Sequence, residues 1–237
     1  MKRVRTVLAV SSVVSALLGA SLTAHAQEGA WQPPTSPAVT PWEAHMGYRG
    51  TFVNSPGFNP FSTNDYLPQV TLGASRALFW RDHFAFAAGL SWDYGETDAT
   101  ARGASTGLTV DRFTVPLTMR YALWSWLHVF ATIAPGVTYA SAHVNEASAP
   151  ASLVKTSWMP SGDASAGARF AFASTHVGPF PVVFWVTAEG GYAWTAPMQL
   201  TMSPDLPSSD PRQTATTDLG SLAMNGGFGR LSVSVAF

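Results

Sequence analysis

The sequence is 237 residues long, and its composition differs from that of a typical soluble protein. Charged residues make up only 11% of it, against about 25% in soluble domains, while aromatic residues make up 12%. The formal net charge is −1 and cysteine is absent, so the composition excludes a disulfide framework and the basic footprint of a nucleic-acid-binding protein.

The first segment has the three parts of a secretory signal peptide. Basic residues within the first five positions precede an apolar run over residues 7–22, and Ala24-His25-Ala26 has the form of a cleavage site. The polar sequence that follows favours cleavage over retention as a membrane anchor. We therefore expect a signal peptide over residues 1–26, and the lack of an Arg-Arg pair favours export by the Sec route. Its removal lowers the formal net charge from −1 to −4.

The remaining chain divides into a leader and a run of β-strands. Residues 27–41, QEGAWQPPTSPAVTP, predict a disordered, Pro-rich leader. From Trp42 onward apolar residues recur at every second position, which is the period of a β-strand. Eight segments have this pattern and the length of a tilted membrane-spanning strand, namely residues 42–53, 66–80, 83–96, 110–124, 127–141, 158–172, 182–194 and about 224–237.

The connections between these segments alternate in length. Long loops are predicted over residues 54–65, 97–109, 142–157 and 195–223. Short or medium turns separate the other pairs of segments. Outer-membrane barrels have tight periplasmic turns and long external loops. We therefore predict that residues 42–237 form an all-β fold, an eight-stranded antiparallel up-and-down transmembrane β-barrel.

Aromatic residues give a second signal, because strand order sorts them to two levels. With the first strand running outward, Trp42, Trp80, Trp124, Trp126, Phe84 and Phe237 fall at the periplasmic end. Trp92, Trp158, Trp194, Tyr66, Tyr94 and Tyr139 fall at the external end. Tryptophan in a soluble core would not sort in this way, whereas amphipathic rings favour the two membrane–water interfaces.

The architecture and the last strand, GRLSVSVAF, resemble the small eight-stranded outer-membrane barrels of Gram-negative bacteria, the OmpA/OmpX type. The resemblance covers about residues 42–237 and includes no motif of one subfamily. It implies a monomer in the outer membrane, in contact with its lipids and lipopolysaccharide, and no nucleic-acid partner. It also implies that Leu231, Val233, Val235 and Phe237 form the signal read by the barrel-assembly machinery.

Most charged residues of the eight segments take the inward phase. The interior of an eight-stranded barrel is just wide enough for side chains to fill, so these charges must be paired or hydrated. We predict a cluster of Glu189, Arg230 and Arg49, which lie at similar heights on neighbouring strands, and a pair of Asp93 and Arg112 at the external end. Plugging ion pairs are the favoured interpretation of these groups, and a proton or ion path is the alternative.

Arg76 is the exception, because its position falls in the lipid-facing phase. Either its side chain reaches the periplasmic headgroups, or a bulge in its strand reverses the phase.

The sequence offers little chemistry. No spacing of histidines suggests a metal site, and no nucleotide-binding motif is present, so we expect no cofactor. Ser141, His143 and Glu146 could serve a lipid A-modifying hydrolase, but their Ser-x-His order differs from the His-x-Ser order of lipid A deacylases.

We therefore predict a non-enzymatic integral barrel with a structural role in the envelope or a binding role for its surface loops. The alternatives are a lipid A-modifying hydrolase and a narrow channel or carrier of small hydrophobic molecules.

Overall fold

The computed structural model describes residues 40–101, 104–146, 152–177, 180–206 and 216–237. The predicted signal peptide and all but the end of the predicted leader lie outside these residues. The elements are β1 (Trp42–Phe52), η1 (Pro56–Phe58), β2 (Tyr66–Arg81), β3 (Phe84–Ala101), β4 (Ala104–Thr114), β5 (Leu117–Trp124), β6 (Leu127–Glu146), β7 (Leu153–Val177), β8 (Phe180–Thr195), β9 (Met198–Pro204), β10 (Thr217–Leu222) and β11 (Gly226–Ala236).

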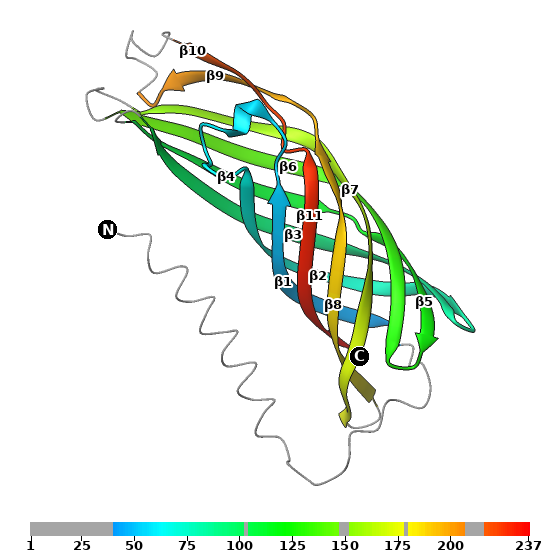
Figure 1. The fold of residues 1–237 in the computed structure, drawn as a ribbon. Helices are drawn as coiled ribbons and strands as arrows, with labels where there is room; N and C mark the ends of the chain where they lie inside the picture. Colours follow the sequence, from blue (N-terminus) through cyan, green and yellow to red (C-terminus); the bar gives the residue numbers. More distant parts are fainter. Residues whose placement is uncertain (1–39, 102–103, 147–151, 178–179, 207–215) are drawn as a thin grey trace, which may run out of the picture. The chain divides into compact units, whose positions relative to one another are not determined.

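The strands form a closed antiparallel ring (Figure 1). β4 and β5 both lie between β3 and β6, so they are two halves of one strand that is interrupted at Val115-Pro116, where proline lacks the amide that the ladder needs. Counted in this way, eight strands make the ring, and β1 closes it by pairing with β11. This confirms the predicted fold class. At the seam, Trp42 and Phe237 exchange backbone hydrogen bonds of 3.0 and 2.9 Å.

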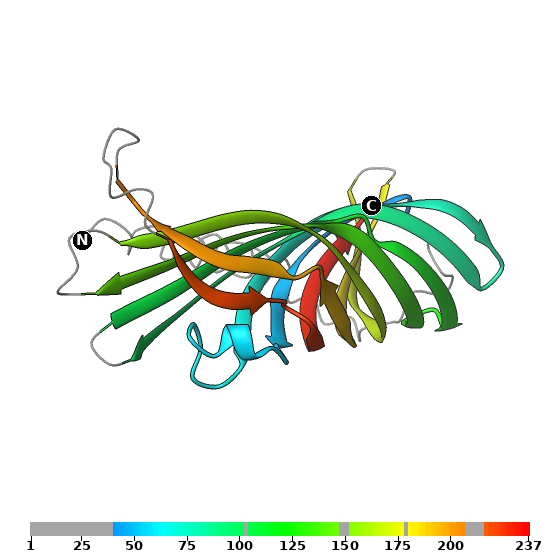
Figure 2. The same ribbon diagram turned by 90° about the horizontal axis from the view of Figure 1, so that it is seen from above.

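The predicted bounds of the long loops are partly wrong. We name as the loop end the end of the ring where β1 meets β2 and β3 meets β4, and as the turn end the opposite one. Much of residues 97–109 and 142–157 belongs to strands, because β3, β4, β6 and β7 continue well past the predicted segments at the loop end. The predicted loop over residues 195–223 contains the hairpin of β9 and β10, which adds to the edge of β7 (Figure 2).

A hydrophobic cluster inside the loop end explains these extensions. We call it the loop-end cluster, and it consists of Val53, Phe58, Phe61, Leu67, Leu108, Val110, Ala140, Ala142, Met159, Met198, Leu200, Met202, Leu222 and Met224. The connection after β1 and the β9–β10 hairpin bury their apolar side chains against the inner faces of β4, β6 and β7. This burial stabilises the strand conformation of residues that the sequence pattern predicted to be loops.

A second, smaller cluster fills the turn end of the ring. It consists of Ala171, Val183, Trp185 and Ala236, with Trp126 packed against it, and we call it the turn-end cluster. The two clusters lie at opposite ends of the interior, and the space between them is lined by polar side chains.

The outer surface of the ring has the reverse character. Its large exposed side chains are apolar, with Leu90 at 69%, Ile133 at 60% and Met119 at 58% exposure. Exposed aromatic rings gather near the turn end, including Trp42, Trp80, Phe84, Trp124 and Phe237, and near the loop end, including Tyr48, Phe52, Trp158, Tyr192 and Trp194. No helix in the part of the chain described here is long and apolar enough to cross a membrane.

Arg76 lies on this outer surface. It stands opposite Trp42 in the register of β1 and β2, and its guanidinium carbon is 5.1 Å from the centroid of the Trp42 ring. Strand β2 does contain a bulge, but it falls between Ala77 and Phe79, so the phase of Arg76 is not reversed. The cation–π contact gives this charge a partner at the turn end.

Candidate functional site: the charged interior

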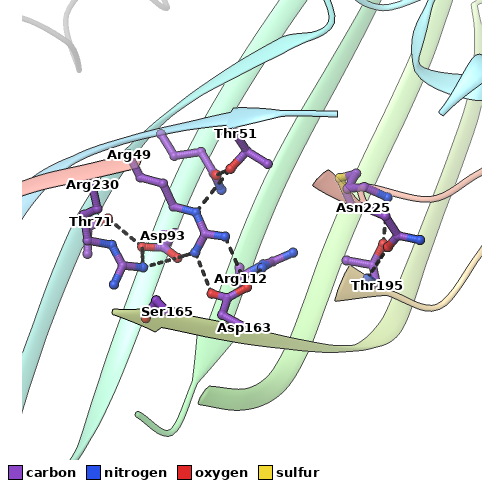
Figure 3. Close-up of polar contacts among 12 residues, drawn as sticks. Arg49, Thr51, Thr71, Asp93, Arg112, Asp163, Ser165, Thr195, Asn225 and Arg230 are labelled. Carbon is purple, nitrogen blue, oxygen red and sulfur yellow. Dashed lines mark hydrogen bonds and ion pairs between the residues drawn. The ribbon is translucent and has the colours of Figure 1, made fainter. Parts of the chain in front are cut away.

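The polar part of the interior is organised around Arg49 of β1, whose side chain is fully buried. Its Nη1 donates to Asp93 at 3.0 Å and to Asp163 at 2.6 Å, and its Nη2 donates to Asp163 at 3.1 Å (Figure 3). Its Nε donates to Thr51 at 3.2 Å, and its guanidinium lies 3.9 Å from the ring centroid of Phe228. Each nitrogen atom of this guanidinium therefore donates a hydrogen bond, and one of its faces packs on an aromatic ring.

Two further arginines complete this group. Arg112 of β4 forms an ion pair with Asp163. Arg230 of β11 contacts Asp93 at 3.3 Å and Glu189 at 3.2 Å. We call the six residues Arg49, Arg112, Arg230, Asp93, Asp163 and Glu189 the upper network. It contains three cations and three carboxylates, so it is neutral.

Strand register places these groups. Arg49 stands directly opposite Arg230 in the β1–β11 pair, and Arg230 stands opposite Glu189 in the β11–β8 pair. Two arginines side by side would repel each other, but the Asp93 carboxylate accepts from both, and Phe228 packs against both guanidinium groups. Thr71 donates a further hydrogen bond of 2.6 Å to Asp93.

The structure brings the predicted interior residues together, and of the predicted contacts it forms the one between Arg230 and Glu189. Arg230 contacts Glu189, while Arg49 reaches Arg230 through Asp93. The predicted pairing of Asp93 with Arg112 is wrong, because among the described ion pairs Arg112 is joined to Asp163. The physical reason is that Asp93 and Arg112 are register neighbours on one wall, while their side chains extend across the lumen to other strands.

Sequence reasoning did not assign Asp163 to a cluster. It lies in the weakest of the eight patterns and is separated from Arg49 by 114 positions. Its inward phase was the available signal, but only closure of the ring shows that β7 faces β1.

A second group, also not predicted, lies nearer the turn end. The Oε2 atom of Glu43 accepts from Arg120 and from Arg169, both at 2.7 Å. Arg169 also donates to Nδ1 of His128 at 3.2 Å and covers the Trp185 ring at 4.0 Å. We call Glu43, Arg120, Arg169 and His128 the lower network. The shared inward phase of these residues near one end of their strands could have suggested it.

A cavity lies between the two networks. Its walls carry Glu43, Arg120 and Arg169 from the lower network, Asp163, Glu189 and Arg230 from the upper, and the hydroxyl-bearing Ser91, Thr114, Thr132, Thr187 and Ser232. Its volume is about 80 Å³. A single water needs about 10–15 Å³ of such space, so several waters or a small hydrated ion fit inside.

The possible hydrolase residues lie on the outside of the barrel. Ser141 and His143 project from the outer face of β6, and the side chain of Glu146 lies outside the described residues. Within the part of the chain described, no hydrogen bond joins Ser141 to His143, and the His143 ring lies over Gly107 close to Asp98.

No group of three or more His, Asp or Glu side chains among the described residues is arranged to hold a metal ion.

Comparison with known proteins gives a fold relationship only. No family model and no curated protein matches the sequence. Solved structures that are similar to it in fold include the following three. The attachment invasion locus protein Ail of Yersinia pestis has a TM-score of 0.42 and 9% identity, covering 83% of this chain and 97% of Ail. The outer membrane protease OmpT of Escherichia coli has a TM-score of 0.45 and 9% identity, covering 89% and 99%. The translocator domain of NalP from Neisseria meningitidis has a TM-score of 0.37 and 10% identity, covering 98% of both chains.

Proposed function

We propose that this chain is an integral outer-membrane β-barrel protein of a Gram-negative bacterium, without catalytic activity. In this proposal it strengthens the envelope or binds partners through its external loops.

One observation carries the proposal: the polarity of the barrel is inverted relative to a water-soluble protein. Arg49, Asp93 and Arg112 are buried, while Leu90, Ile133 and Met119 are more than half exposed. In water such a surface would be costly, at about 25 cal/mol for each Å² of apolar area left exposed. In lipid the same surface is favourable, and a closed ring leaves no strand edge unpaired.

The aromatic levels support an orientation. Tryptophan rings near both ends of the ring match the two interfaces of a bilayer. With tight connections on the periplasmic side, the turn end faces the periplasm and the loop end faces outward. Two charged side chains of the described outer surface lie at these levels beside aromatic rings: Arg76 contacts the Trp42 ring near the turn end, and Asp111 accepts a hydrogen bond from Nε1 of Trp92 near the loop end.

The filled interior supports a closed barrel over a channel. The upper network crosses the lumen from β1 to β7, and hydrophobic clusters fill the space beyond the networks at both ends. A continuous water path would have to break several of these contacts at once, so we expect no steady conductance in planar bilayers.

The folded loop end supports a role in binding. Here β9, β10 and η1 pack on the loop-end cluster, so this end presents a shaped surface. A preorganised surface loses less conformational entropy on binding than a mobile loop does. Lipopolysaccharide and other envelope lipids would surround the barrel below it, and the barrel-assembly machinery would insert it through β11 as a monomer.

The deciding experiment combines fractionation with gel migration and lipid contact. We expect the protein in the outer-membrane fraction, with faster migration before boiling than after it. Lipids brominated on their acyl chains should quench the fluorescence of the exposed tryptophans. Recovery as a soluble periplasmic protein with unquenched tryptophans would overturn the proposal.

A separate measurement addresses catalysis. Lipid A mass spectra of cells with and without the protein should be identical. A changed acylation pattern that depends on Ser141 or His143 would favour the hydrolase alternative.

A further inference from the structure

The charges of the lumen do not balance. Between the two hydrophobic clusters, the inward ion pairs involve five arginines, Arg49, Arg112, Arg120, Arg169 and Arg230, and four carboxylates, Glu43, Asp93, Asp163 and Glu189. Arginine stays protonated in proteins. Counted over these arginines and carboxylates, the enclosed side chains therefore carry one excess positive charge.

The excess belongs to the lower network. The upper network has equal numbers of cations and carboxylates, whereas Glu43 is shared between Arg120 and Arg169. Both guanidinium groups contact the same oxygen of Glu43, so they are close together and repel each other. An uncompensated charge away from bulk water is costly unless a counter-ion or a dense hydrogen-bond shell accompanies it.

The two arginines differ in how completely they are satisfied. Arg169 has His128, the Trp185 face and Glu43 around it, and its side chain is 8% exposed. For Arg120, Glu43 is the one ion-pair partner among the described residues, and its side chain is 17% exposed, the most of the five. Arg120 also lines the cavity, so its remaining N–H groups have access to whatever occupies that space.

The rest of the cavity wall suits an anion beside Arg120. Ser232 brings a hydroxyl donor and His45 an imidazole, while the Thr132 hydroxyl is hydrogen-bonded to that of Thr118. The carboxylates of the upper wall are already engaged, Asp163 by Arg49 and Arg112, and Glu189 by Arg230 and Ser165. The volume admits a halide with a few waters.

We propose that this cavity is a binding site for one small monovalent anion, with chloride as the physiological species, held against Arg120. The anion neutralises the lumen and is part of the folded structure. The proposal concerns the interior alone and holds whether or not the barrel performs the function proposed above.

The test compares salts on the full-length barrel purified in detergent. Unfolding is measured in sodium chloride and in sodium gluconate at equal ionic strength, because gluconate is a bulky organic anion that cannot take the place of a single halide against Arg120. A ligand that binds only the folded state lowers the unfolding equilibrium constant by a factor of 1 + [L]/Kd. Chloride at ten times its Kd should therefore lower this constant about tenfold.

Two variants localise the effect. Arg120→Gln removes the excess charge and leaves Glu43 paired with Arg169, so it should fold and should lose the difference between the salts. Arg81→Gln makes the same change of charge at an 81% exposed position at the end of β2 and should retain the difference between the salts. If Arg81→Gln also loses the difference in unfolding between the two salts, that difference arises from surface charge, and the proposal is overturned.

A direct measurement keeps the proposal testable even if Arg120→Gln does not fold. Crystals of the unchanged protein grown in sodium bromide should show an anomalous peak beside Arg120 in the cavity. The absence of that peak, together with equal unfolding of the unchanged protein in chloride and gluconate, would overturn the proposal.

Discussion

Replacing Arg49 tests how strongly the upper network stabilises the folded barrel. Replacing it by Met keeps much of its volume and removes its charge. Asp163 then retains Arg112, and Asp93 retains Arg230, but the upper network is left with three carboxylates and two cations. Breaking a buried ion pair from one side costs about 3–5 kcal/mol, and because Arg49 is fully buried and contacts two carboxylates we expect the upper part of this range.

The assay is reversible unfolding in urea from lipid vesicles, followed by tryptophan fluorescence. Arg49→Met should lower the free energy of unfolding by about 4 kcal/mol. Adding Asp93→Asn restores equal numbers of charges and keeps Arg112 with Asp163 and Arg230 with Glu189, so the double variant should recover more than about 1 kcal/mol. A loss below about 1 kcal/mol in Arg49→Met, the range of exposed ion pairs, would refute the claim that this network stabilises the barrel.

The seam, the loop end and the lipid-facing surface can each be tested. A Cβ at Gly47 would lie 2.5 Å from the backbone oxygen of Leu231, so Gly47→Val should abolish the heat-modifiable form, while Gly229→Ala, which meets nothing within 4 Å, should keep it. Leu200→Ala removes a fully buried side chain of the loop-end cluster; hydrogen exchange should accelerate in β9 and β10 and stay unchanged in β1 and β11. Arg76→Leu removes a charge from the outer surface together with its contact to the Trp42 ring, and urea unfolding from vesicles should show a gain of at most about 1 kcal/mol, because an outward Arg near an interface costs about 0–1 kcal/mol.

Several features of the fold could be predicted from the sequence because the side chains of a strand alternate strictly between two faces. That alternation assigns Glu43, Arg49 and Asp93 to the interior and Leu90 to the exterior without any knowledge of neighbouring strands. The pattern of turns and strand ends also sufficed to predict the number of strands in the ring.

The loop end could not be predicted in the same way. Residues 97–109 lack a strong alternating pattern, and they extend β3 and β4 because Leu108 and Val110 are buried under side chains from β9 and from the connection after β1. These contacts join segments far apart in the sequence, so no local window of sequence contains the information.

Sequence by itself therefore determined which residues face inward, because the two-residue period is a local property of each strand. Only the tertiary structure decided which inward residues meet. Arg49 pairs with Asp163 across the lumen, and Glu43 holds Arg120 and Arg169 from strands that are not its neighbours. The physical reason is that a narrow closed ring lets long side chains reach across to opposite walls, so the partners are set by the curvature of the whole sheet and not by adjacency along it.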